Sequence, residues 1–265
     1  MKHMRKYLWI LGISYKNYTV YIHDIIGINI IYVIRLSVII FMYKAIYAMA
    51  GTTSVSGYSI DSVVRALIFV QAVVVSKSRI TDEINSDIKT GKIAIHLLNP
   101  INYVWFKFLE FFPKFVYNFC ISCGVGLVLG FLFLGGISTS LPGIAGAIIL
   151  VLGGMLIAFF GYMMIGLLGF YTEDNEAFRL IYGKIDMFFG GNILPIPFMP
   201  LILQTIALSL PFFHSGYTAG LIFSHFTMDK FLLYLGIQII RVVVFISACL
   251  LIFSHAIKRL TINWG

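Results

Sequence analysis

The sequence predicts an all-α integral membrane protein with six transmembrane helices. Hydrophobic residues make up 60% of its 265 residues and charged residues only 11%, whereas soluble domains carry about 25% charged residues. The mean hydropathy is +0.95. Residues 115–172 and 187–228 contain no Asp, Glu, Lys or Arg, and a membrane-spanning helix needs about 20 apolar residues. These observations exclude a soluble globular domain.

The N-terminal residues 1–23 are basic and aromatic. Lys16 lies within this stretch and Asp24 follows it, so the apolar residues before them are too few for the core of a signal peptide. We expect an amphipathic helix at the cytoplasmic face, with Trp9 at the level of the lipid headgroups. The transmembrane domain then covers residues 24–256, and its first two spans are expected at about 25–49 and 60–76.

Residues 77–102 form a polar, charge-dense segment in a chain that is otherwise mostly apolar. Its charged side chains are Lys77, Arg79, Asp82, Glu83, Asp87, Lys89 and Lys92. We expect a cytoplasmic loop with a short helix at about 81–90, through which a soluble partner can contact the membrane domain. The acidic side chains also suit the positive end of that helix's dipole, so capping and solvation are their alternative role.

The third and fourth spans are expected at about 113–134 and 141–170, with a Gly- and Pro-rich turn between them. Ser122, Gly126 and Gly130 recur every four residues, a pattern typical of a face on which two helices pack closely. Cys120 and Cys123 form a C-x-x-C pair inside an apolar stretch. We interpret both as packing residues, because thiols in apolar surroundings are unreactive.

The fifth span, at about 177–195, is expected to break. Four of the seven prolines lie in the charge-free interval after it, and proline removes a helical hydrogen bond. We predict a re-entrant, extracellular segment over 190–226 that acts as a gate, since irregular backbone at membrane depth must face protein or water. Its key residues are Gly190, Gly191, Pro195, Pro200 and Pro211. The sixth span is expected at about 229–255, followed by a tail over 257–265.

Basic residues set the orientation of the chain. Most of the 19 lysines and arginines fall on the side of the N-terminus, the 77–102 loop and the C-terminal tail. The positive-inside rule then places both termini in the cytoplasm of a multi-pass cell-membrane protein. The excess positive charge reflects this topology and the membrane lipid around the chain, so we expect no nucleic-acid partner.

Motifs for catalysis are absent from the sequence. It contains no G-x-x-x-x-G-K-[ST] loop, no H-E-x-x-H and no G-x-S-x-G. The six histidines form no i, i+4 pair that could hold a metal. We therefore expect neither an enzyme nor a cofactor or metal in this chain.

Two arginines lie near the middle of predicted spans. Arg35 and Arg241 are each about a dozen residues from a helix end, and a charge at that depth is costly unless it serves a partner or a wet cavity. One hypothesis is that they line the substrate path and favour an anionic group. The alternative, given equal weight, is a structural bond to Asp186 or to a backbone carbonyl; Asp186 itself is expected to pair locally with Lys184.

Several short motifs, in a fixed order, resemble those of ATP-binding-cassette exporter permeases of the type-2 class. In the charged loop they are Glu83-Ile84, Gly91-Lys92-Ile93-Ala94 and Leu97-Leu98-Asn99-Pro100-Ile101, and further on they are Tyr171-Thr172-Glu173-Asp174, Gly190-Gly191-Asn192-Ile193-Leu194-Pro195, Phe198-Met199-Pro200 and Leu210-Pro211-Phe212. Two positions depart from the family's pattern. Tyr171 replaces a common Trp, and Asn99 replaces a common Arg, which removes one positive contact from the loop.

The resemblance implies a permease subunit of an ATP-driven exporter. It implies separate ABC ATPase subunits that carry ATP and Mg, and a second permease subunit that is identical or a sister chain. The loop residues implied to dock on the ATPase are Asp82, Glu83, Asp87, Gly91, Lys92 and Pro100. An ATP-independent channel, a secondary carrier or a membrane scaffold remain the alternative functions, and the sequence does not select a substrate.

Overall fold

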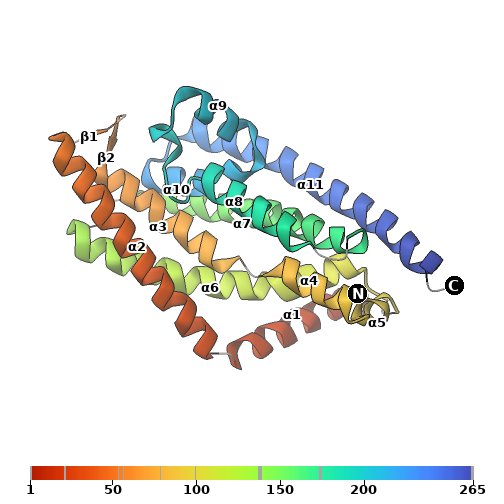
Figure 1. Cartoon of the computed structure of the whole chain (residues 1–265). Helices are drawn as coiled ribbons and strands as arrows, with labels where there is room; N and C mark the ends of the chain where they lie inside the picture. Colours follow the sequence, from red (N-terminus) through yellow and green to blue (C-terminus); the bar gives the residue numbers. More distant parts are fainter. Residues whose placement is uncertain are drawn as a thin grey trace.

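The computed structural model describes residues 2–20, 22–52, 54–55, 57–77, 79–98, 100–136, 139–172 and 175–263. It is an elongated helical bundle (Figure 1). The bundle is built from α2 (Ile22–Ala50), α3 (Ile60–Ser76), α6 (Tyr103–Leu134), α7 (Leu141–Leu167), α8 (Glu176–Phe189) and α11 (Met228–Asn263). The chain is thus largely α-helical, and its strands are confined in the described residues to a hairpin of β1 (Ser54–Val55) and β2 (Tyr58–Ser59).

Shorter elements lie at the two ends of the bundle. One end holds α4 (Ile80–Lys89) and α5 (Lys92–Leu97), and both termini of the chain lie there too (Figure 1). Near the other end, the chain folds into η2 (Ile196–Phe198), α9 (Leu201–Ser209), η3 (Pro211–Ser215) and α10 (Tyr217–Ser224). The 77–102 loop and the 190–226 segment are therefore joined by the long helices.

Four helices among the described residues are long and apolar enough to cross a membrane. They are α2, α6, α7 with its 3-10 extension η1 (Leu168–Phe170), and α11 as far as Lys258. Helix α3 has 17 residues and α8 has 14, fewer than the roughly 20 of a typical span. The structure supports an all-α membrane protein, while the count of six spans stays a prediction.

Helix α3 lies inside the bundle, where it packs on α2, α6 and α10. Most of its side chains from Val63 to Val73 are buried. Helix α10 can approach α3 closely because Gly220 has no Cβ. A Cβ there would lie 2.5 Å from the carbonyl oxygen of Ala66. On the other side, the predicted stripe of Ser122, Gly126 and Gly130 is buried in α6. This stripe is a helix-packing face, as its spacing predicts.

Helix α6 begins at Tyr103, ten residues before its predicted start at 113. The side chain of Asn102 accepts a hydrogen bond of 2.9 Å from the backbone N–H of Val104 and caps this earlier start. Pro113 lies inside the helix rather than at its beginning. The charged first turns of α6 extend the helix beyond the predicted span toward α4, and the limits of the span itself stay a prediction.

The N-terminal helix α1 (Lys2–Val20) packs along α6. The hydroxyl of Tyr18 donates a 2.9 Å hydrogen bond to the side-chain oxygen of Asn118. Trp9 is 66% exposed, and its contact with lipid headgroups stays a prediction. One side of α1 is thus held by the bundle and the other is open to the surroundings.

Helix α8 ends at Phe189, where Gly190 and Gly191 follow. Gly191 has a φ of 67°, and a Cβ there would lie 2.5 Å from the ring of Tyr217. No other residue type fits this turn without strain. Pro195 and Pro200 directly precede η2 and α9, and Pro211 is the first residue of η3, positions where a missing N–H costs nothing.

Candidate functional site

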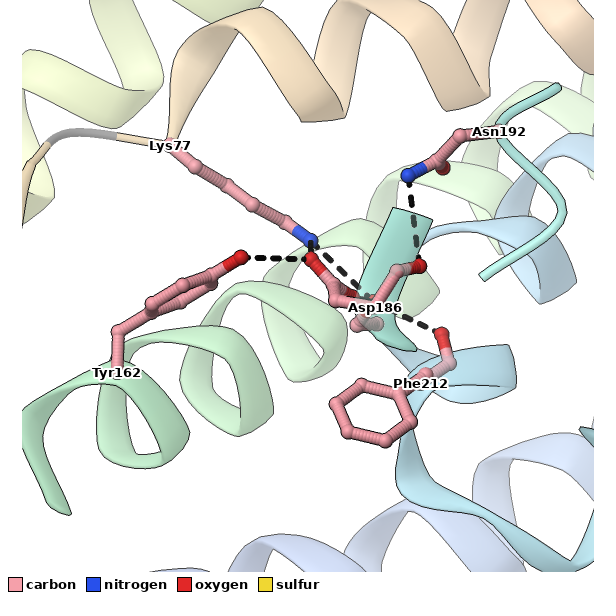
Figure 2. Close-up of polar contacts among 6 residues, drawn as sticks. Lys77, Tyr162, Asp186, Asn192 and Phe212 are labelled. Atoms are coloured by element: carbon pink, nitrogen blue, oxygen red, sulfur yellow. Dashed lines mark hydrogen bonds and ion pairs between the residues drawn. The ribbon is translucent and has the colours of Figure 1, made fainter. Parts of the chain in front are cut away.

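The buried carboxylate of Asp186 on α8 is the centre of a polar network (Figure 2). Lys77 Nζ donates to its Oδ2 at 2.7 Å, and the hydroxyl of Tyr162 donates to the same oxygen at 3.1 Å. Ser215 Oγ lies 3.2 Å from Oδ1. The side-chain amide of Asn192 lies 3.5 Å from the backbone oxygen of Asp186. The carboxylate therefore contacts side chains from three other segments of the chain, and a fourth segment contacts the backbone oxygen of the same residue.

The network joins the start of the charged loop to the helix break. Lys77 directly follows α3, Tyr162 lies on α7, and Ser215 ends η3. Asn192 belongs to the turn after α8, and its carbonyl oxygen accepts a hydrogen bond from the buried side chain of Gln71 on α3. The turn is thereby tied to α3 and to Asp186 at once.

The predicted local pair of Asp186 with Lys184 is wrong. Asp186 pairs with Lys77, and Lys184 is exposed. Residues two apart on a helix do not face each other, so the two side chains leave α8 in different directions. A partner 109 residues away in the chain was not visible in the local sequence.

A second ion pair connects the same two regions. Arg179 Nε lies 3.0 Å from Asp82 Oδ1, and this contact joins α8 to α4. Together with Lys77–Asp186 it ties both the start of α8 and its last turn to the charged loop. Movement of α4 would therefore act directly on α8.

The acidic residues of α4 all contact basic residues of the chain itself. Glu83 pairs with Lys114 at 3.1 Å. Asp87 is buried, pairs with Lys107 at 2.8 Å and accepts a 2.8 Å hydrogen bond from the hydroxyl of Tyr103. With the pair between Asp82 and Arg179, these contacts anchor α4 against α6 and α8.

The outward side of the loop is formed mainly by α5 and its flanks. Lys92 and Pro100 are exposed, and the apolar side chains of Ile95 and Leu98 are 66% and 86% exposed. Gly91, with a φ of 72°, makes the turn from α4 into α5. This apolar surface with a basic neighbour was not singled out from the sequence, because α5 itself was not expected.

A cavity of about 320 Å³ lies between α2, α4 and α8, beside the Asp186 network. Its charged lining residues are Arg35, Lys77, Arg79, Asp82, Arg179, Lys184 and Asp186. Arg35 comes from the middle of α2, whereas Arg79 and Lys184 lie at the exposed side. The cavity thus extends from the apolar bundle to the charged loop.

The two arginines of the predicted substrate path lie in different surroundings. Arg35 lines the cavity. Arg241 donates hydrogen bonds of 2.9 Å and 3.0 Å to the carbonyl oxygens of Leu208 and Ser209, and it also contacts that of Leu210. Its guanidinium therefore caps the C-terminus of α9, which is the backbone-carbonyl alternative considered for it.

Three positions of the sequence motifs lie outside the described residues: Asn99, Glu173 and Asp174. The remaining motif positions fall in the charged loop, at the α7–α8 junction and in the 190–226 segment. The motifs therefore lie in the segments that the ion pairs of α8 connect, the charged loop and the segment after α8, and at the start of α8 itself.

A family model described as "ABC-2 family transporter protein" matches residues 13–263, nearly the whole chain. The match includes the charged loop, the cavity and the segment after α8. No curated protein matches the sequence.

Proposed function

Because the chain belongs to the ABC-2 family of transporter membrane proteins, we propose that it is the permease subunit of an ATP-driven exporter in the cell membrane. The sequence has no nucleotide-binding loop of the Walker type. ATP and Mg are then bound by a separate ABC ATPase. A second permease, identical or a sister chain, would complete the path, since one bundle of this size encloses a large substrate poorly.

The proposed mechanism is supported by two ion pairs between the charged loop and α8. Asp82–Arg179 and Lys77–Asp186 connect them within 3.0 Å and 2.7 Å. When the ATPase subunits close on ATP, they would displace α4 and α5. Helix α8 would move with α4, and the turn at Gly190 would pass this movement to the 190–226 segment, the proposed extracellular gate.

The proposed docking surface is the outward side of α5 and its flanks. Gly91, Lys92 and Pro100 of the sequence-based set belong to it. Asp82, Glu83 and Asp87 instead fix α4 in place through the ion pairs within the chain. We add Ile95 and Leu98, because exposed apolar side chains on a polar loop are typical of a protein interface.

Co-purification tests this proposal. The full chain, isolated in mild detergent with its associated proteins, should carry an ABC ATPase and hydrolyse ATP. The double change Ile95→Ser with Leu98→Ser should remove the ATPase from the complex. Leu141→Ser is the matched control, because Leu141 is 79% exposed and begins α7, outside the charged loop.

Two results would contradict the proposal. If no ATP-binding protein accompanies the wild-type chain in several detergents, an ATP-independent carrier, a channel or a scaffold becomes the better reading. If the ATPase stays bound to the Ile95→Ser, Leu98→Ser variant as tightly as to wild type, the docking surface lies elsewhere.

A further inference from the structure

The cavity between α2, α4 and α8 has an excess of positive charge. Five of its lining side chains are cationic and two are acidic. Lys77 and Arg179 are neutralised by Asp186 and Asp82. The charge that remains comes from Arg35, Arg79 and Lys184. Within the described parts of the chain, their side chains form no hydrogen bond or ion pair.

Arg35 is the most informative of the three. It is half-buried and follows 13 residues after the start of α2 at Ile22, or about 20 Å along the helix. An arginine inside a membrane span is costly unless it faces a partner or a wet cavity. The side chain faces this cavity, so a bound anion would offset its cost.

The number and kind of cations indicate the anion. Guanidinium groups bind phosphate through two parallel hydrogen bonds, and a phosphate group can balance more than one cation. A single carboxylate would leave two of the three unbalanced. The volume of about 320 Å³ lies at the lower end of the range for small-molecule sites, which leaves space for the group that carries the phosphate.

We propose that this cavity binds a phosphate-bearing anion, held by Arg35, Arg79 and Lys184. The phosphate can belong to a lipid headgroup or to a water-soluble compound, because the recognising chemistry is the same. This inference rests on the proposed permease function, because it assigns a class of ligand to the substrate path. Binding is measured without ATP or an ATPase, so its failure is distinct from a missing ATPase partner.

The test is a binding titration on the purified full chain in detergent, by isothermal titration calorimetry. The probes are inorganic pyrophosphate and a short-chain phosphatidic acid, and phosphatidylcholine with the same chains is the zwitterionic comparison with no net charge. Wild type should bind at least one of the two anionic probes more tightly than phosphatidylcholine. Arg35→Gln and Lys184→Gln should each raise the Kd about tenfold, the effect of losing one charge-assisted hydrogen bond.

Three further comparisons distinguish a loss of binding from a loss of folding. Lys16→Gln removes an exposed lysine outside the cavity and should leave the Kd unchanged. Lys184 is itself exposed, so Lys184→Gln tests the cavity even if Arg35→Gln lowers the stability of the chain. Arg35→Lys keeps the charge without the planar fork and should bind more tightly than Arg35→Gln.

The probes also identify the source of the phosphate. Binding of pyrophosphate supports a water-soluble phosphate compound, and binding of phosphatidic acid alone supports a lipid headgroup. The proposal is overturned if neither anionic probe binds wild type better than phosphatidylcholine. It is equally overturned if both Arg35→Gln and Lys184→Gln bind the probes as tightly as wild type.

Discussion

At the scale of single residues, the ion pair between Lys77 and Asp186 joins the charged loop to α8. Both side chains are nearly buried, with exposed fractions of 11% and 7%. Removing one partner of such a pair leaves an uncompensated charge away from water. The network is therefore sensitive to single changes and tolerant of matched double changes.

We expect Asp186→Asn to lower the free energy of unfolding by about 3 kcal/mol, the cost typical of leaving a buried charge unpaired. The double variant Lys77→Met, Asp186→Asn should lose less, because neither position of the pair then carries an unpaired charge. Thermal unfolding in detergent measures both. Asp61→Asn, at an exposed acid, should change the melting temperature little, and a melting temperature of Asp186→Asn equal to wild type would refute the structural role.

Glycine at the break after α8 gives a second residue-scale prediction. Gly191→Ala combines a positive φ with a clash against Tyr217 and should lower stability by about 2 kcal/mol. Gly57→Ala shares the positive φ but has open space around it, and Gly136→Ala has open space and no positive φ. The expected order of destabilisation in thermal unfolding is Gly191, then Gly57, then Gly136; a different order would mean that the contact with Tyr217 is not decisive.

At the scale of elements, α8 is a short helix held at two points to the charged loop. Arg179 near its start contacts α4, and Asp186 in its last turn contacts Lys77. Under the proposed mechanism, we expect a short helix fixed in this way to move as a rigid body with α4. The segment after it begins at Gly190, where an added Cβ would meet the carbonyl oxygen of Asp186, so the turn is tightly packed against the helix that moves it.

Hydrogen exchange on the complex with its ATPase measures this coupling. ATP should change the protection of amides in residues 190–226 in wild type. Lys77→Gln should abolish most of that change, because α8 loses one of its two connections to the loop. Lys16→Gln serves as the control for a lost lysine. An ATP-dependent change of wild-type size in Lys77→Gln would show that the signal reaches the segment by another route.

At the scale of the whole molecule, the predicted six membrane crossings include two short helices, α3 and α8. Helices α3 and α8 are shorter than a typical span, yet α3 is enclosed by α2, α6 and α10. A helix surrounded by protein does not need full hydrophobic length, since its ends face neighbouring helices rather than lipid. With the predicted six crossings and the positive-inside rule, α5 and both termini are expected in the cytoplasm.

Labelling of single cysteines distinguishes the topologies. In a chain without Cys120, Cys123 and Cys249, a membrane-impermeant thiol reagent applied to intact cells should modify Leu141→Cys and Thr205→Cys. It should modify Ile95→Cys only after the cells are permeabilised. All three positions are exposed in this chain, so in cells without the proposed ATPase, which would cover Ile95, access to the reagent depends on the side of the membrane. If Ile95→Cys reacts in intact cells, the predicted six-span arrangement is wrong.

The sequence alone determined the class of the protein and the positions of its polar and irregular segments. Charge-free intervals, the 77–102 loop and the glycines and prolines after Phe189 are local properties, because hydropathy and backbone restrictions act over a few residues. The family motifs lie in these same segments. The start of α6 was missed because its first turns are charged and Pro113 resembles a helix start.

The tertiary structure alone decided which charges meet. Asp186 was expected beside Lys184 and instead contacts Lys77, the acids of α4 pair with α6 and α8, and Arg241 caps α9 while Arg35 faces a cavity. Each of these partners lies on another element, and helix direction and packing, rather than spacing in the sequence, bring them together. Local physics set where the chain is helical, and long-range packing set what its few charges can bind.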